Sequence, residues 1–122
     1  MPSNVGISLP HGNLLEITSN TSNGDTETSG WIKATGESSV VGYFIADNGG
    51  PAAADATLEI KQSIDKEEVD ITNSVAPSPE GNADPFEFDL VGNWAKADFE
   101  SNEDISNVRL IVYRSTRVSP IN

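Results

Sequence analysis

Hydrophobic and polar residues alternate along much of this chain, most clearly in residues 56–73. A period of two is typical of a β-strand with one face on a core and the other in water. Residues 65–68, Asp-Lys-Glu-Glu, form a predicted turn, after which Val69 and Ile71 begin a return strand. The stretch therefore predicts a β-hairpin. The inward face of its first strand is expected to carry Leu58, Ile60, Gln62 and Ile64.

The same alternation predicts further short strands on both sides of the hairpin. The most apolar is VVGYFIA, residues 40–46, which we expect at the centre of a sheet. Gly42 inside this strand predicts a bulge or close backbone packing. Segments rich in Ser, Asn, Asp, Gly or Pro predict loops at residues 19–29, 47–51 and 74–85. The remaining predicted strands are residues 13–18, 30–35, 86–90, 94–99 and 108–114.

Seven or eight short strands without an amphipathic helix predict an all-β fold. We expect a two-sheet antiparallel sandwich or jelly roll, with an open barrel as the alternative. A chain of 122 residues is long enough for one domain. The predicted organisation is an irregular N-terminal arm at residues 1–12, a β-sandwich domain at 13–114 and a C-terminal tail at 115–122. The order of the strands cannot be read from the sequence.

The negative net charge of the chain limits the kinds of molecule that it can bind. The formal net charge is −12, and only seven residues are Lys or Arg. A site that neutralises phosphates needs clustered positive charge, so we expect neither nucleic-acid binding nor docking on an anionic membrane. Such acidity suits solubility or docking on a basic surface. The chain has no cysteine, which excludes disulfides and thiolate sites.

The N-terminal stretch does not have the pattern of a targeting signal. Residues 1–12 contain neither a basic segment nor an apolar segment of the secretory type. The longest run without a charged or strongly polar residue, 40–46, is far shorter than a membrane-spanning helix. We therefore expect the protein to remain, or to be assembled, inside the cell that makes it.

No residue pattern predicts catalysis, a cofactor or a metal site. His11 is the only histidine and lies between Pro10 and Gly12 in a predicted loop, without a nucleophile at a recognisable spacing. Acidic clusters lack the spacing and central glycine of an EF-hand calcium loop, so we interpret them as solvated turns. These clusters are Asp65, Glu67, Glu68 and Asp70 in the hairpin turn, and Glu100, Glu103 and Asp104 later in the chain.

Aromatic residues permit two interpretations. They could form a platform on which sugar rings stack, which is typical of a carbohydrate-binding module. Alternatively, Trp31 and Trp94, each at the start of a strand, cap the ends of the core. The candidate platform consists of Trp31, Tyr43, Trp94 and Tyr113.

All the arginines lie in the last predicted strand and the tail, at Arg109, Arg114 and Arg117. One hypothesis is that they pair with carboxylates of a neighbouring subunit. The simpler interpretation is that they offset the acidic loop just before them.

The hairpin sequence TLEIKQSIDKEEVDIT resembles a module of small bacteriophage virion proteins. In these, a strand of the type T-L-x-I-x-Q-S-x-D precedes a turn, and a strand of the type V-R-L-x-V closes the sheet. This chain has Lys66-Glu67-Glu68-Val69 where Gly-x-x-Trp often follows the aspartate. The matching residues are Thr57, Leu58, Ile60, Gln62, Ser63 and Asp65, then Val108, Arg109, Leu110 and Val112.

The resemblance implies a capsid decoration (cement) protein that binds the major capsid protein and stabilises the shell. It implies a homotrimer at the surface of a virion assembled in the host cytoplasm, with no cofactor and no catalytic residue. The alternative is a carbohydrate-binding or receptor-binding module of a tail or fibre. The expected contacts are apolar or basic residues in the irregular ends or next to them: Val5, Ile7, Leu9, Arg114, Arg117, Val118 and Ile121. Removal of residues 1–12 is expected to abolish shell binding without unfolding the sandwich.

Overall fold

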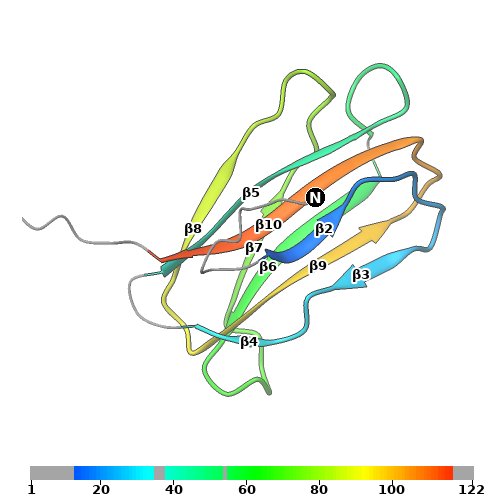
Figure 1. Ribbon diagram of the computed structural model, residues 1–122. Coiled ribbons are helices and arrows are strands. Elements are labelled where there is room, and N and C mark those ends of the chain that lie inside the picture. Colours follow the sequence, from blue (N-terminus) through cyan, green and yellow to red (C-terminus); the bar gives the residue numbers. More distant parts are fainter. Residues whose placement is uncertain (1–12, 35–37, 54, 117–122) are drawn as a thin grey trace, which may run out of the picture.

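The protein folds as a β-sandwich of two antiparallel sheets (Figure 1). The computed structural model describes residues 13–34, 38–53 and 55–116, which contain nine strands and no helix that could cross a membrane. The prediction of an all-β sandwich is confirmed. The strands are β2 (Asn13–Ile17), β3 (Thr26–Thr28), β4 (Ile32–Lys33), β5 (Ser38–Asp47), β6 (Ala56–Ser63), β7 (Ile71–Val75), β8 (Phe86–Leu90), β9 (Trp94–Ser101) and β10 (Asn107–Thr116).

The first sheet has the strand order β2-β10-β5-β8. β5 and β10 are its interior strands, and they pair from Asn107 opposite Asp47 to Thr116 opposite Ser38. The prediction that residues 40–46 form a central strand is therefore confirmed. β10 ends at Thr116, two residues beyond the predicted end of the last strand.

Gly42 is required where β5 and β10 approach each other closely. An ideal Cβ at this position would lie 1.9 Å from the carbonyl oxygen of Ile111. Any side chain would clash with the backbone of β10, so the predicted close packing is confirmed.

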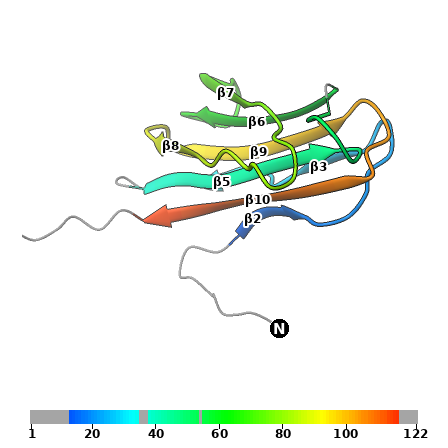
Figure 2. The same cartoon turned by 90° about the horizontal axis from the view of Figure 1, so that it is seen from above.

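The second sheet has the order β3-β9-β6-β7, and β4 also pairs with β9. β6 and β7 form the predicted hairpin, with Leu58 opposite Val75 at one end and Gln62 opposite Ile71 at the other. β6 and β9 pair over the full length of both strands. In Figure 2, β10 and β2 of the first sheet lie on one side of the molecule and β6 and β7 of the second sheet on the other.

The core lies between the two layers. Phe44 of the first sheet and Phe99 of the second meet edge to face, with ring centroids 5.8 Å apart. Burial of an aromatic side chain of this size stabilises the fold by about 1.5–3 kcal/mol. The alternation groups one set of residues on each of three strands, and the structure packs these sets on the core: Val40, Phe44 and Ala46 on β5, Ala95, Ala97 and Phe99 on β9, and Val108, Leu110 and Val112 on β10. Ile45, on the other face of β5, is also buried.

Two residues of the predicted hairpin do not belong to its inward face. Ile64 is 66% exposed and Val69 is 46% exposed. β6 ends at Ser63, and the chain then leaves the sheet because the amide of Ile64 donates a hydrogen bond to the Asp70 carboxylate instead of to a strand. The predicted face is correct only as far as Gln62.

Three predicted boundaries are also wrong. Residues 19–29 contain β3, whose three polar residues pair with β9 at the edge of the sheet. Of residues 30–34, the described part of the predicted strand 30–35, only Ile32 and Lys33 form a strand. β7 extends to Val75, so the following loop begins later than predicted. The described chain consequently has nine strands instead of seven or eight.

The alternation in residues 86–90 predicts that Phe86, Phe88 and Leu90 point inward and that Glu87 and Asp89 point outward, and β8 has this orientation with less complete burial. Leu90 is buried, whereas Phe86 and Phe88 are half-buried, pack against the core and stack on each other with centroids 5.5 Å apart. Glu87 and Asp89 are exposed, as predicted.

Candidate functional site

Exposed hydrophobic side chains gather at one end of the sandwich. The only exposed large hydrophobic residues in the described part of the chain are Ile64, Val69 and Val91, and Val91 is 73% exposed. All three lie in two connections at the same end, residues 64–70 between β6 and β7 and residues 91–93 between β8 and β9 (Figure 1). We call the surface formed by these two connections the turn end. Exposed apolar side chains that cluster in this way mark interaction sites.

Hydrogen bonds hold the two connections together. The side-chain oxygen of Gln62 accepts hydrogen bonds from the amides of Val91 and Gly92, both at 2.8 Å, and its amide nitrogen donates to the Asp89 carbonyl at 3.0 Å. The Asn93 side chain donates to the carbonyl oxygen of Ile64 at 3.1 Å. The turn end is therefore fixed to the end of β6.

The connection 64–70 is also ordered internally. The Ser63 hydroxyl donates to the Glu68 carbonyl at 2.6 Å and accepts from the Lys66 amide at 2.9 Å. Amide donors at Glu67 and Glu68 hold the pKa of Asp65 below its usual range. Lys66 has a φ of 69° and places its Nζ 4.2 Å from the Trp94 ring centroid. Four carboxylates and one lysine leave this connection with three net negative charges.

The outer face of the five-stranded sheet is divided by charge. One half, the lysine half, carries Trp31, Lys33, Lys61, Trp94 and Lys96. Lys66 of the turn end lies over this half, so all four lysines of the chain gather there. The other half, the acidic half, carries Thr26, Thr28, Thr57, Glu59, Asp98 and Glu100.

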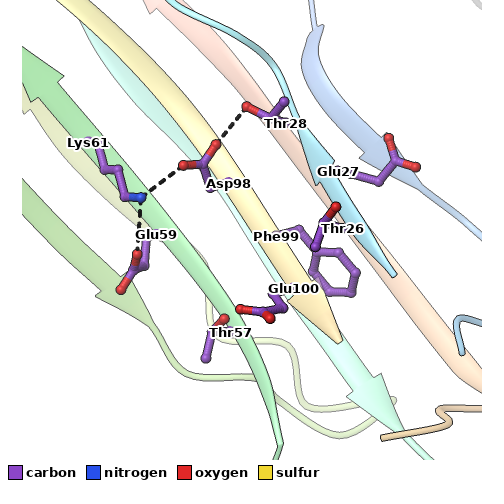
Figure 3. Close-up of a pocket in the computed structure, with 9 residues that line it drawn as sticks. All are labelled: Thr26, Glu27, Thr28, Thr57, Glu59, Lys61, Asp98, Phe99 and Glu100. Carbon is purple, nitrogen blue, oxygen red and sulfur yellow. Dashed lines mark hydrogen bonds and ion pairs between the residues drawn. The ribbon is translucent and has the colours of Figure 1, made fainter. Parts of the chain in front are cut away.

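A network of charges centred on Asp98 lies at the boundary between the halves (Figure 3). Lys61 contacts Asp98 at 2.9 Å and Glu59 at 3.5 Å, while the Thr28 hydroxyl donates to the other Asp98 oxygen at 2.6 Å. Burial raises the pKa of Asp98, but the hydrogen bonds from Thr28 and Lys61 outweigh it, so the pKa lies below its usual range. The bond to Asp98 raises the pKa of Lys61. Both groups therefore stay charged at neutral pH.

The acidic half is hollowed. A depression of about 430 Å³ is lined by side chains of β3, β6 and β9, and Figure 3 shows Thr26, Thr57 and Glu100 beside it. It is open to solvent and presents threonine and carboxylate groups to an incoming side chain.

The predicted aromatic platform is divided between the two sheets. Trp31 and Trp94 lie on the lysine half, whereas Tyr43 and Tyr113 lie on the outer face of the first sheet, where they line a depression of about 550 Å³. Lysine ammonium groups lie over both tryptophan rings. The Nζ of Lys96 is 4.8 Å from the Trp31 ring centroid, and the Nζ of Lys66 lies over the Trp94 ring. Cation–π contacts of this kind compete with a stacked sugar.

Three acidic side chains outside the turn end, Asp47, Glu103 and Asp104, fix loops. Asp47 is 2% exposed, accepts hydrogen bonds from the amides of Gly49 and Glu80, and has a lowered pKa for that reason. Asp104 and Glu103 accept hydrogen bonds from the amides of Asn23 and Asp55. Within the described ranges, no three His, Asp or Glu side chains lie close enough together to hold a metal ion.

Arg114 is the one predicted contact residue that the structure describes. Its Nη1 donates to the Lys33 carbonyl at 2.9 Å, so its guanidinium joins β10 to β4 across the end of the sandwich. Its Nε is buried without a hydrogen-bond partner among the described residues. The other predicted contacts lie outside the described residues, as does His11: Val5, Ile7, Leu9, Arg117, Val118 and Ile121.

Sequence reasoning placed Gln62 on the inward face but missed its role in joining two connections. Asn93 and Asp47 were missed as well. The Asp47-Asn48-Gly49 pattern was a usable signal for Asp47, because aspartate binds the amide two residues later in Asx turns.

Comparison with protein-family models and with curated proteins finds no match for this sequence.

Proposed function

We propose that this chain is a structural virion protein that decorates a bacteriophage capsid by binding the major capsid protein. The observation that carries the proposal is the turn end, where Ile64, Val69 and Val91 are exposed on connections fixed by hydrogen bonds. A rigid surface loses little conformational entropy when it docks. The proposal requires no catalytic residue and no cofactor.

The charge of the turn end defines the partner surface. The connection 64–70 carries three net negative charges around two exposed aliphatic side chains. Its complement is an apolar pocket with a rim of Lys and Arg side chains on the outer face of the capsid protein. The net charge of −12 on the whole chain steers association in the same direction.

The described chain begins and ends near the same surface. Ser38 pairs with both Thr116 and Leu90, and Leu90 directly precedes the connection 91–93. Asn13, the first described residue, pairs with Tyr113, three residues before Thr116. β2 therefore begins, and β10 ends, at or near the turn end. Val5, Ile7, Leu9, Val118 and Ile121 stay proposed contacts with the capsid protein.

Co-sedimentation with shells tests the proposal. The shells are assembled from the major capsid protein encoded in the same genome as this chain. We expect saturable binding of the full-length chain, with a fixed number of copies per shell. A chain that stays in the supernatant at about 10 µM, or a genome that encodes no capsid protein, would contradict the proposal.

Double substitutions test which residues contact the shell. Ile64→Ser with Val91→Ser should weaken shell binding at least tenfold, because two aliphatic side chains then lose about 1.5–3 kcal/mol each of burial. Both residues are exposed in the free chain, so folding should not change. Ala76→Ser with Ala83→Ser is the matched control, because these exposed residues lie in the loop that follows β7 at the opposite end. Val5→Ser with Ile7→Ser and Leu9→Ser tests the N-terminal contacts.

A further inference from the structure

We propose that the outer face of the five-stranded sheet is a self-complementary interface that pairs two copies of this chain about a twofold axis. The inference is independent of shell binding, because it concerns the sheet face instead of the turn end. A twofold contact joins the same patch on both copies, so the patch must complement itself. The lysine half and the acidic half of this face meet that requirement.

The strand register sets the complementarity. On the neighbouring strands β6 and β9, Lys61 lies opposite Lys96. Two residues away along each strand, Glu59 lies opposite Asp98. The boundary between the two halves therefore crosses β6 and β9 at the same level. We place the twofold axis along this boundary, so that it is parallel to the sheet and perpendicular to the strands. The strands of the second copy then run in the opposite direction to those of the first.

This operation brings opposite charges face to face. Each strand lies over the same strand of the second copy, so Lys96 faces Asp98 of the second copy and Lys61 faces Glu59. The next outward-facing residues from the axis along β9 are Trp94 and Glu100, and these face each other in the two copies. The ammonium groups of Lys33 and Lys66 lie over the Trp94 ring and therefore also face Glu100. Each contact occurs twice. Charge complementarity of this kind fixes the register of an interface.

The shape of the face is complementary as well. β3 and β4 both pair with β9, and β3 pairs beside the acidic half whereas β4 pairs beside the lysine half. The twofold operation lays β4 of one copy over β3 of the other. The half-buried Trp31 ring then lies over the depression beside Thr26 and Thr28. Tryptophan in a pocket is a frequent anchor of protein interfaces.

The net charge of each copy opposes the pairing and predicts its salt dependence. At 0.15 M salt the screening length is about 8 Å, so repulsion between distant carboxylates is weak while the facing pairs still interact. At 0.01 M salt the screening length is about 30 Å, and the whole charge of −12 on each copy is felt. We expect paired copies at the higher salt concentration and single chains at the lower salt concentration.

Light scattering coupled to size exclusion tests the inference on the full-length chain at about 100 µM in 0.15 M salt. The expected mass is twice the chain mass of 13.0 kDa. A mass of one chain, or of three, would overturn the inference. The threefold association that the resemblance implies is thereby distinguished from the twofold contact.

Charge reversal provides the decisive comparison. Lys33→Glu with Lys61→Glu reverses two lysines of the lysine half, and Glu59→Lys with Glu100→Lys reverses the two carboxylates that face them. Each variant alone should associate at least tenfold more weakly, and an equimolar mixture of the two should form a mixed pair. Glu16→Lys with Arg109→Glu is the control on the other sheet and should pair normally. Pairing by both reversed variants alone, or no mixed pair, would overturn the inference.

A further variant keeps the test valid if a reversed chain does not fold. Thr26 is exposed, so Thr26→Trp should fold normally while it fills the depression. This variant should be a single chain under the conditions in which the unmodified chain pairs. A paired Thr26→Trp chain would overturn the placement of Trp31.

Discussion

Replacement of Gln62 by methionine tests whether the turn end is fixed by this side chain. Gln62 is 2% exposed and makes three hydrogen bonds, with the amides of Val91 and Gly92 and with the Asp89 carbonyl. Methionine has a similar length but makes none of them. A hydrogen bond contributes about 0.5–1.5 kcal/mol net, so the loss of three should lower the free energy of unfolding by about 2–4 kcal/mol.

Urea denaturation of the purified chain measures this change. Since domains of this kind have a free energy of unfolding of about 5–15 kcal/mol, the shift in midpoint is readily detected. Asn102→Met is the matched control, because its side chain is exposed and only its backbone amide is bonded, to Asp55. The control should change stability by less than about 0.5 kcal/mol. The same small change in Gln62→Met would refute the assigned role.

Three further predictions concern positions elsewhere in the fold. Gly42→Ala should cost at least about 2 kcal/mol by urea denaturation, because its Cβ clashes with the backbone of β10, whereas Gly50→Ala, which has open space, should be tolerated. The lowered pKa of Asp47 means that its stabilisation is present above about pH 4 and is lost as the pH falls through the lower folded value. Acid denaturation curves of Asp47→Asn should therefore be flatter below pH 4. The raised pKa of Lys61 means that its stabilisation is complete below about pH 10 and is lost at higher pH, so Lys61→Gln should unfold with a weaker dependence on alkaline pH.

The sequence predicted the parts of the fold that depend on local alternation. In residues 94–99 and 108–112, every second residue is buried, in agreement with the alternation, because one face of each strand packs on the core. The prediction was wrong where apolar alternation continues past the end of a strand, as at Ile64. It also missed β3, because a polar edge strand such as Thr26–Thr28 has no buried face to mark it.

The candidate surfaces could not be predicted because they depend on strand order. Trp31 and Trp94 are far apart in the sequence, and only the pairing of β4 with β9 brings them to one face. The gathering of all four lysines has the same origin. For the turn end, the sequence indicated exposed acidic residues but assigned Ile64 to the core. The joining of residues 64–70 to residues 91–93 depends on a buried glutamine whose partners are distant in sequence.

The most direct test of the proposed function is light scattering coupled to size exclusion, with the full-length chain run alone and with expanded shells of the capsid protein from the same genome. Binding to the major capsid protein predicts that the chain co-migrates with the shells and that Ile64→Ser with Val91→Ser separates from them. If the unmodified chain elutes apart from the shells at saturating concentration, the proposed function is wrong.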